Sequence, residues 1–147
     1  MGSPVFNQLN VVVRDMDATL EFYRAAGLRI PDETVWRTDS GAHHVQVAMS
    51  NGVDLEFDSE TLAKVYNKGW RKPSDALGRC VIGLSMETRD AVDQRCKALA
   101  DLGYTVSQPP FDTFWGARYA IVLDPDGNNV GLMSPSDPGK RSAPPNI

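Results

Sequence analysis

The sequence predicts an α+β protein that contains two copies of one unit, each in the order strand, helix, strand, strand, strand. An amphipathic segment of helical period follows the first strand of each half, and a glycine ends it, Gly27 in the first half and Gly103 in the second. Three short strand-like segments separated by turn residues then follow each helix. The chain of 147 residues has room for both copies in one domain.

The first half begins with residues 9–13, which are rich in β-branched side chains and typical of a strand. Asp15 is placed to cap the following helix. The apolar face of that helix is expected at Ala18, Phe22, Ala25 and Ala26. Strands are then expected at residues 34–38, 44–48 and 53–57, with polar and glycine-containing turns between them.

The second half repeats this order. A strand is expected at residues 81–86, and Thr88 is placed to cap the next helix. The apolar face of this helix is expected at Val92, Cys96, Leu99 and Ala100. The remaining strands are expected at residues 105–107, 118–123 and 129–133, with a proline- and glycine-containing turn at 124–127.

The repeat sets the expected domain boundaries. A single domain is expected over residues 5–134, with module one at 5–58, a connecting segment at 59–79 and module two at 80–134. Residues 61–66 of the connecting segment could form one or two helical turns. The proline-rich residues 135–147 are expected to form a mobile tail.

Composition excludes several classes of partner. The formal net charge of −4 and the lack of basic runs argue against nucleic acid and against a membrane surface. No apolar stretch approaches the roughly 18–20 residues of a membrane span, and no signal peptide is recognisable. Cys80 and Cys96 match no disulfide, zinc or redox pattern, and Cys96 is expected to be buried and unreactive. We therefore expect a cytoplasmic protein.

Two motifs carry a resemblance to a known family. Residues 9–27, with Val13-Arg14-Asp15 and Leu20-Glu21-Phe22-Tyr23, resemble the opening of the glyoxalase/bleomycin-resistance/dioxygenase superfamily, the vicinal oxygen chelate proteins. Residues 124–128, preceded by Trp115-Gly116 and a strand, resemble the closing hairpin of that family. The likeness spans about residues 5–134. It implies two βαβββ modules that form an incomplete barrel around a ligand-binding cleft, and a homodimer.

The resemblance also assigns four metal-ligand positions, which fall on Gln8, Glu56, Val81 and Gly131. Valine and glycine side chains offer no donor atom, whereas a tight divalent site needs three or four protein donors. We therefore expect neither a metal nor another cofactor. A weak site rebuilt from Gln8, Glu56 and one histidine stays open. His43 and His44 are adjacent on a strand, so at most one of them can face the cleft.

The candidate ligand-binding residues are aromatic or polar. Stacking surfaces are expected from Trp36, Trp115 and Tyr119, although such residues also serve in cores and dimer interfaces. Polar anchors are expected from Gln8, His43, His44 and Glu56. Glu56 is flanked by two apolar residues on a strand, so its side chain faces either the cleft or bulk water.

Two functions from different classes remain. The first, which we favour, is a metal-free small-molecule binding protein that resembles the bleomycin-resistance branch and captures an aromatic or polycyclic ligand, as in antibiotic resistance. The alternative is an enzyme of the same superfamily, a lyase, isomerase or dioxygenase, with a degenerate metal site or with Glu56 as general base. The sequence has neither a phosphate-binding glycine loop nor a serine nucleophile elbow.

Overall fold

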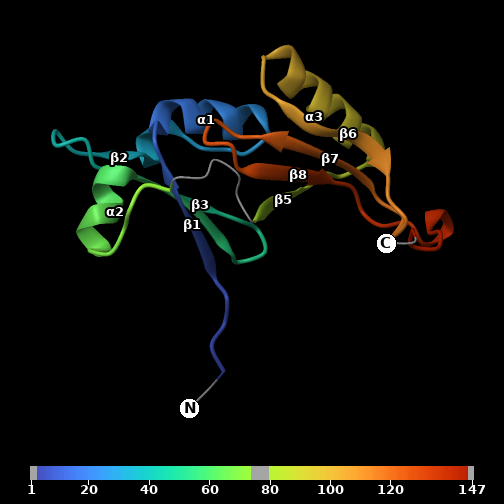
Figure 1. The fold of residues 1–147 in the computed structure, drawn as a ribbon, viewed down its shortest axis with the longest axis horizontal. Helices are drawn as coiled ribbons and strands as arrows, with labels where there is room; N and C mark the ends of the chain where they lie inside the picture. The colour runs from blue at the N-terminus through green and yellow to red at the C-terminus, as the bar shows by residue number, and fades with distance from the viewer. Residues whose placement is uncertain (1–2, 74–79, 146–147) are drawn as a thin grey trace. The chain divides into compact units, whose positions relative to one another are not determined.

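The computed structural model describes residues 3–73 and 80–145 (Figure 1). The chain divides into two compact units, unit 1 at residues 1–73 and unit 2 at residues 74–147. Each unit contains one four-stranded sheet, and the strand orders of the two sheets correspond position by position. The α+β class and the repeated order of elements are therefore confirmed. No helix in the described ranges has both the length and the apolar character needed to cross a membrane.

Unit 1 is a mixed sheet with helices joined to it. Its strands are β1 (Gln8–Val13), β2 (Trp36–Arg37), β3 (His43–Ala48) and β4 (Asp54–Ser59), in the spatial order β1-β4-β3-β2. β1 runs parallel to β4, and the other neighbours are antiparallel. The helices are α1 (Met16–Ala25), α2 (Glu60–Tyr66) and the 3₁₀ turn η1 (Asp32–Thr34).

Helix α1 begins and ends as the sequence predicts. The Asp15 carboxylate accepts a hydrogen bond from the backbone N–H of Ala18, and Gly27 after the helix has φ of 109°. The buried face differs from the expected one, however. Phe22 and Ala26 are buried as predicted, whereas Ala18 and Ala25 are only half-buried. The other buried residues of the helix are Met16, Thr19, Leu20 and Tyr23. The Tyr23 ring contacts the sheet, since its centroid lies 4.5 Å from that of Phe57.

One strand prediction in unit 1 needs correction. The strand expected at residues 34–38 is mostly absent, because η1 occupies its start and β2 has only two residues. Thr34 bonds back to the carbonyl of Pro31, which curls this segment into a turn. The segment expected to connect the modules begins with the last residue of β4, Ser59, whose hydroxyl accepts from the N–H of Leu62 and caps α2.

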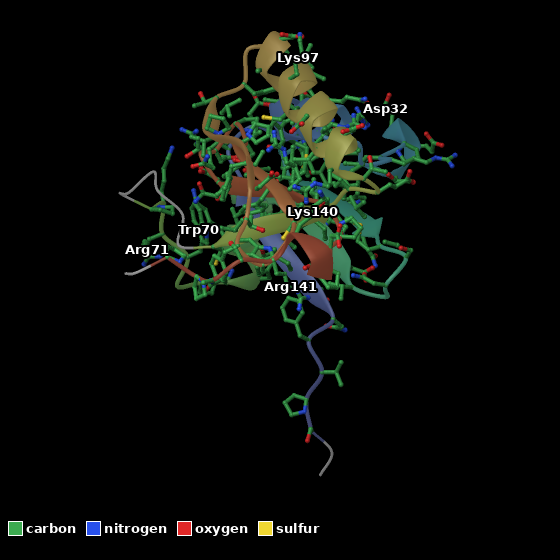
Figure 2. The ribbon with its side chains drawn as sticks, turned by 90° about the vertical axis from the view of Figure 1, so that its right-hand side faces the viewer. Asp32, Trp70, Arg71, Lys97, Lys140 and Arg141 are labelled. Atoms are coloured by element: carbon green, nitrogen blue, oxygen red, sulfur yellow. The ribbon has the colours of Figure 1, made fainter. Side chains whose placement is uncertain are left out.

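Unit 2 repeats this arrangement. Its strands are β5 (Val81–Ser85), β6 (Val106–Asp112), β7 (Arg118–Leu123) and β8 (Asn129–Met133), in the order β5-β8-β7-β6. Helix α3 (Arg89–Asp101) is capped by Thr88 as predicted, and Gly103 follows it with φ of 93°. The helix buries Val92, Cys96 and Leu99 but leaves Ala100 exposed. Lys97, labelled near the upper end of this helix in Figure 2, forms an ion pair with Asp101.

Strand β6 is longer than the predicted residues 105–107. It continues through Pro109 and Pro110, which cannot donate backbone hydrogen bonds, and its pairing with β7 shifts register there.

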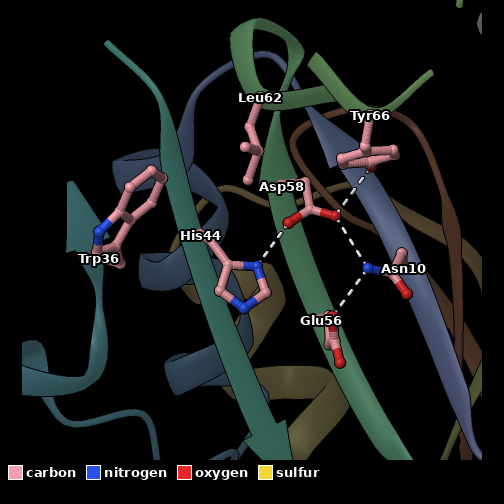
Figure 3. Close-up of a pocket in the computed structure, with 7 residues that line it drawn as sticks. All are labelled: Asn10, Trp36, His44, Glu56, Asp58, Leu62 and Tyr66. Carbon is pink, nitrogen blue, oxygen red and sulfur yellow. Dashed lines mark hydrogen bonds and ion pairs between the residues drawn. The ribbon is translucent and has the colours of Figure 1, made fainter. Parts of the chain in front are cut away.

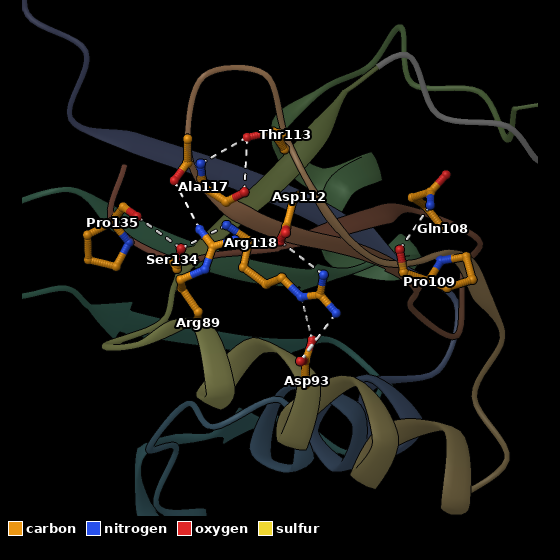
Figure 4. Close-up of polar contacts among 11 residues, drawn as sticks. Arg89, Asp93, Gln108, Pro109, Asp112, Thr113, Ala117, Arg118, Ser134 and Pro135 are labelled. Atoms are coloured by element: carbon orange, nitrogen blue, oxygen red, sulfur yellow. Dashed lines mark hydrogen bonds and ion pairs between the residues drawn. The ribbon is translucent and has the colours of Figure 1, made fainter. Parts of the chain in front are cut away.

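Ion pairs hold the far end of this strand pair. Arg118 on β7 contacts Asp93 on α3 and Asp112 on β6, and Arg89 also contacts Asp112 (Figure 4).

The segment after β8 is attached to the loop before β7. It contains the 3₁₀ turn η2 (Pro138–Lys140). The backbone N–H of Asp137 donates to the carbonyl of Gly116, and that of Ser142 donates to the carbonyl of Phe114. These bonds restrain residues 137–142, which the sequence placed in a mobile tail. Mobility of the last residues stays a prediction.

Candidate functional site

One face of the unit 1 sheet is polar because β4 alternates. Leu55 and Phe57 are buried in the core, so Asp54, Glu56 and Asp58 lie on the opposite face. The register then fixes their neighbours. Asn10 on β1 lies beside Glu56, while His44 on β3 lies beside Asp58, and Trp36 on β2 lies beside His44. Residues from all four strands thus meet on this face.

These residues line an open pocket of about 540 Å³ (Figure 3). The pocket lies within unit 1, and its lining residues come from the four strands and from helix α2. Its lining comprises Asn10, Trp36, His44, Glu56, Asp58, Leu62 and Tyr66. Its size is within the usual range for small-molecule sites, roughly 300–1,000 Å³.

Asp58 is the buried centre of the pocket. Its side chain is only 2% exposed, and three different elements donate hydrogen bonds to its carboxylate. His44 Nδ1 lies 2.6 Å from Oδ1, while Asn10 Nδ2 and the Tyr66 hydroxyl lie 2.9 and 3.0 Å from Oδ2. Burying a carboxylate is costly unless such donors replace its water. These three bonds therefore explain how the charge is tolerated here.

Tyr66 reaches Asp58 because Ser59 turns the chain into α2 directly after β4. The helix is seven residues long, and its last residue brings the phenol back over the strand that the helix follows. Desolvation, and then the hydrogen bond to Asp58, raise the pKa of Tyr66 to about 12. The phenol is therefore neutral at physiological pH and acts as a donor to the carboxylate.

His44 has one nitrogen engaged and one open. An ionised carboxylate only accepts hydrogen bonds, so the contact with Asp58 places a proton on Nδ1 of His44. Within the described part of the chain, Nε2 has no hydrogen-bond partner, and the side chain is 33% exposed. His43 lies on the opposite face of β3, where its ring is 3.5 Å from the Arg37 guanidinium. Only His44 thus lines the pocket.

Asn10 connects the two pocket carboxylates. Its Nδ2 donates to Glu56 at 2.9 Å as well as to Asp58, and its Oδ1 accepts from Gln8 Nε2 at 2.7 Å. Gln8 therefore contacts Asn10 but is not among the lining residues. Glu56 keeps one carboxylate oxygen without a described side-chain partner.

Trp36 supplies the aromatic wall. It is the cross-strand partner of His44, and 49% of its surface is exposed. Figure 3 shows its indole on the β2 side of His44, with Leu62 above the strands. An exposed indole offers a flat apolar face and one N–H donor.

The other predicted aromatic residues belong to unit 2. The ring of Tyr119 is 6.1 Å from that of Trp115 and 6.2 Å from that of Phe111, edge to face in both cases. Tyr119 also crosses Gly131, where an added Cβ would lie 2.6 Å from the tyrosine hydroxyl. A side chain at this position of β8 would therefore have to displace the Tyr119 ring.

Two of the four positions that the resemblance assigns to metal ligands offer no donor atom. Val81 has no donor atom, and Tyr119 fills the place of a side chain at Gly131. In unit 1, Gln8 and Glu56 are both hydrogen-bonded to Asn10. No group of three or more histidine, cysteine, aspartate or glutamate residues in the described ranges could hold a metal ion. The donor set therefore does not fit a divalent ion.

The structure brings together only part of the predicted site. Trp36, His44 and Glu56 line the pocket, whereas Gln8 and His43 lie outside its lining, and Trp115 and Tyr119 are in unit 2. Sequence reasoning missed Asn10, Asp58, Leu62 and Tyr66. Strand alternation could have found two of them, since Asn10 and Asp58 each lie two residues from a predicted site residue.

Comparison with solved structures supports the fold. A glyoxalase/bleomycin resistance protein/dioxygenase from Nocardioides is 22% identical, with a TM-score of 0.65 over 97% of this chain and 91% of that one. A glyoxalase-related enzyme from Fulvimarina pelagi is 17% identical, with a TM-score of 0.66 over 88% and 86% of the two chains. A superfamily member from Sphaerobacter thermophilus is 22% identical, with a TM-score of 0.61 over 90% and 98%.

No curated protein matches the sequence. The family model described as glyoxalase/bleomycin resistance protein/dioxygenase superfamily matches residues 5–132, which is most of the chain. This match includes both motifs that carry the resemblance and nearly all of both sheets. The chain therefore belongs to the glyoxalase/bleomycin resistance protein/dioxygenase superfamily.

Proposed function

We propose that the unit 1 pocket binds a small flat molecule without a metal ion, as the favoured hypothesis from the sequence holds. The observation that carries this proposal is the exposed face of Trp36 beside the polar group of His44, Glu56 and Asp58 in one pocket. Ligand sites commonly combine an apolar or aromatic wall with a few convergent polar groups. Such capture needs no reactive group, in keeping with the bleomycin-resistance branch.

The hydrogen-bonding groups indicate which ligands fit. Asn10, Tyr66 and the Nδ1–H of His44 all donate to the two carboxylates. The groups left to contact a ligand are mainly hydrogen-bond acceptors, namely His44 Nε2 and an oxygen of Glu56. The indole N–H of Trp36 adds one donor. The ligand is therefore an aromatic or polycyclic compound that carries hydrogen-bond donors and lacks a carboxylate or phosphate.

The biological role that follows is sequestration of such a compound in the cytoplasm, with the protein acting as a homodimer. Exposed apolar side chains on unit 2, among them Trp115 and Met133, are available for a subunit contact or for the ligand itself. Sedimentation equilibrium at several protein concentrations tests the dimer. A single monomeric species throughout would refute that part of the proposal.

Tryptophan fluorescence tests the ligand proposal. A panel of neutral and cationic aromatic compounds is titrated into the protein with and without a chelator, and we expect saturable quenching that the chelator leaves unchanged. Trp36→Leu should abolish this response. Trp70→Phe is the matched control, because Trp70 is also in unit 1 but lies against Lys64, outside the pocket. Quenching that survives Trp36→Leu would contradict the assignment.

An enzymatic role is the second candidate, and the pairing of His44 with the buried Asp58 favours it. The sequence suggested Glu56 as the general base. Glu56→Gln separates a role of this side chain in binding from a role as general base, because it keeps the side-chain shape and removes the charge. Turnover of a candidate substrate that is unchanged in Glu56→Gln would exclude Glu56 as the base.

A further inference from the structure

We infer that His44, held by Asp58, is a metal-free proton acceptor in the unit 1 pocket, and that it acts on neutral ring compounds with a weakly acidic C–H. The inference deepens the proposed function, because it rests on the same pocket being the ligand site. Neither the family match nor the sequence assigns this role to the pair. It follows from the orientation of one imidazole.

The first step concerns which nitrogen can accept a proton. The Asp58 carboxylate accepts from His44 Nδ1 at 2.6 Å, so that nitrogen carries hydrogen and Nε2 keeps its lone pair. A general base must present such a lone pair to the bound molecule. His44 lines the pocket and Nε2 has no partner in the described ranges, so it meets this requirement.

The second step concerns how firmly the imidazole is held. Asn10 and Tyr66 occupy the other oxygen of Asp58, at 2.9 and 3.0 Å, and the aspartate is nearly fully buried. The carboxylate therefore has no freedom to turn away from the histidine. A fixed carboxylate selects one tautomer and stabilises the imidazolium that forms when Nε2 takes a proton. Asp58 is thus a positioning residue.

The third step concerns the charges around the ring. The titratable groups that face His44 are Asp58 and Glu56 on β4 and Tyr66 on α2. The two carboxylates make the surroundings of the ring negative, whereas the phenol stays neutral because its pKa is about 12. The same carboxylates disfavour an anionic substrate. A neutral compound therefore suits this base best.

The fourth step places the substrate. Trp36 and His44 are cross-strand partners, so a flat molecule stacked on the indole has its edge beside the imidazole. The reaction is then a proton transfer: the substrate C–H bond breaks, the proton moves to Nε2, and the electron pair stays on the substrate. Compounds in which this pair expels an internal leaving group, or is delocalised into a carbonyl, are the chemical class concerned.

The test uses 5-nitrobenzisoxazole, a flat neutral probe. Removal of its ring C–H forms a nitrile, breaks the N–O bond and leaves the electron pair on a coloured phenolate, so atoms and electrons balance without another reactant. We expect the full-length protein to accelerate this reaction over buffer. His44→Gln should lower kcat/KM by about 100-fold or more. His43→Gln is the matched control and should not change the rate, because His43 lies on the other face of β3.

Asp58 is tested by comparing its effects on kcat and KM. Asp58→Asn should lower kcat more than it changes KM, because the imidazole is no longer held in one tautomer and the imidazolium that forms loses its carboxylate. Should this variant fail to fold, Tyr66→Phe removes one bond to Asp58 and leaves the histidine contact. Tyr66→Phe should lower kcat by a smaller amount and leave KM nearly unchanged.

Binding is measured separately with 5-nitroindazole, which has a similar shape and cannot undergo the ring opening. Trp36-dependent quenching by this analogue, combined with no acceleration of the probe, would overturn the inference and leave the proposed function standing. Acceleration that survives His44→Gln would also overturn it. No Trp36-dependent quenching, again with no acceleration, would count against both proposals.

Discussion

His44 and Asp58 are directly opposed on β3 and β4, and the histidine Nδ1 lies 2.6 Å from a carboxylate oxygen that is almost fully buried. The same carboxylate also accepts from the amide of Asn10 and the phenol of Tyr66. Strands β1 and β3 and helix α2 therefore each contribute one hydrogen-bond donor to this carboxylate. A substitution at Asp58 should change a measurable property of each donor residue.

The titration of Tyr66 reports on this carboxylate. Desolvation and then the hydrogen bond to Asp58 raise its pKa to about 12, above the usual value near 10. An absorbance titration of the phenolates should contain a late component, near pH 12, that is lost in Tyr66→Phe. Asp58→Asn should lower the pKa of this component without removing it, because desolvation remains.

The raised pKa of Tyr66 also fixes how stability depends on pH. The contribution of the Tyr66 phenol to the free energy of unfolding is fully present below about pH 10 and is lost as the pH rises through about 12. Urea unfolding across this range checks it. A Tyr66→Phe variant whose alkaline loss of stability equals that of the parent protein would contradict the assignment.

Gly131 and Tyr119 give a second prediction. A Cβ at Gly131 would lie 2.6 Å from the tyrosine hydroxyl and 2.9 Å from its ring, so Gly131→Ala must displace the ring. We expect the free energy of unfolding to fall by about 1–3 kcal/mol, as in overpacked sites. The Tyr119→Leu background should recover much of this loss in a double-mutant cycle.

Gly83 provides the control for this substitution. It pairs with Gly131 across β5 and β8, but an added Cβ there meets nothing within 4 Å. Gly83→Ala should leave stability unchanged or slightly raise it, since it restricts the unfolded chain. Both variants are measured by chemical denaturation. Equal losses of stability at the two glycines would show that the loss comes from the backbone and not from a clash with Tyr119.

Local patterns in the sequence predicted most of the fold. β-branched runs, helix caps at Asp15 and Thr88, and glycines with positive φ after both helices act over a few residues, and each was found where expected. The predictions were wrong where tertiary context overrode the local pattern. β6 extends through two prolines because its pairing tolerates register shifts, and residues 32–34 curl because Thr34 bonds back to Pro31.

The pocket was harder to predict because it depends on strand register. Glu56 and His44 could be named from residue type and alternation, but their partners depend on which residues are opposed across β1, β3 and β4. Asp58 directly follows the strand predicted at residues 53–57, so the predicted strand does not place it in the pocket. Its place there depends on the pairing of β3 with β4, which puts it opposite His44. Tyr66 was assigned to a connecting segment, and only the cap at Ser59 directs it back to the pocket.

The two cysteines should differ sharply in reactivity. Cys96 is buried on α3, and burial, followed by the charge of Asp93, raises the pKa of its thiol. Cys80 is exposed. Because the thiolate is the nucleophile, iodoacetamide should label Cys80 in the native protein and Cys96 only after unfolding, as mass spectrometry of peptides will show. Rapid native labelling of Cys96 would indicate local opening of unit 2.

Acid stability should depend on Asp112 in unit 2. The hydrogen bond from Arg118, and then the charge of Arg89, lower the pKa of the Asp112 carboxyl (Figure 4). A lowered pKa in the folded state contributes stability above the unfolded pKa, near 4, which is lost as the pH falls through the folded value. Asp112→Asn should therefore be less stable than the parent protein at neutral pH, and the difference should shrink in acid.

Thermal unfolding between neutral pH and about pH 2 measures this convergence. Asp101→Asn is the control, because Asp101 forms an exposed pair with Lys97 on α3, a type that contributes little to stability. The parent and Asp112→Asn curves should approach one another below about pH 4, the usual aspartate pKa, while the Asp101→Asn curve follows the parent throughout. A constant offset for Asp112→Asn at every pH would mean that the side chain acts through packing and that its charge has no part in joining β6 to β7.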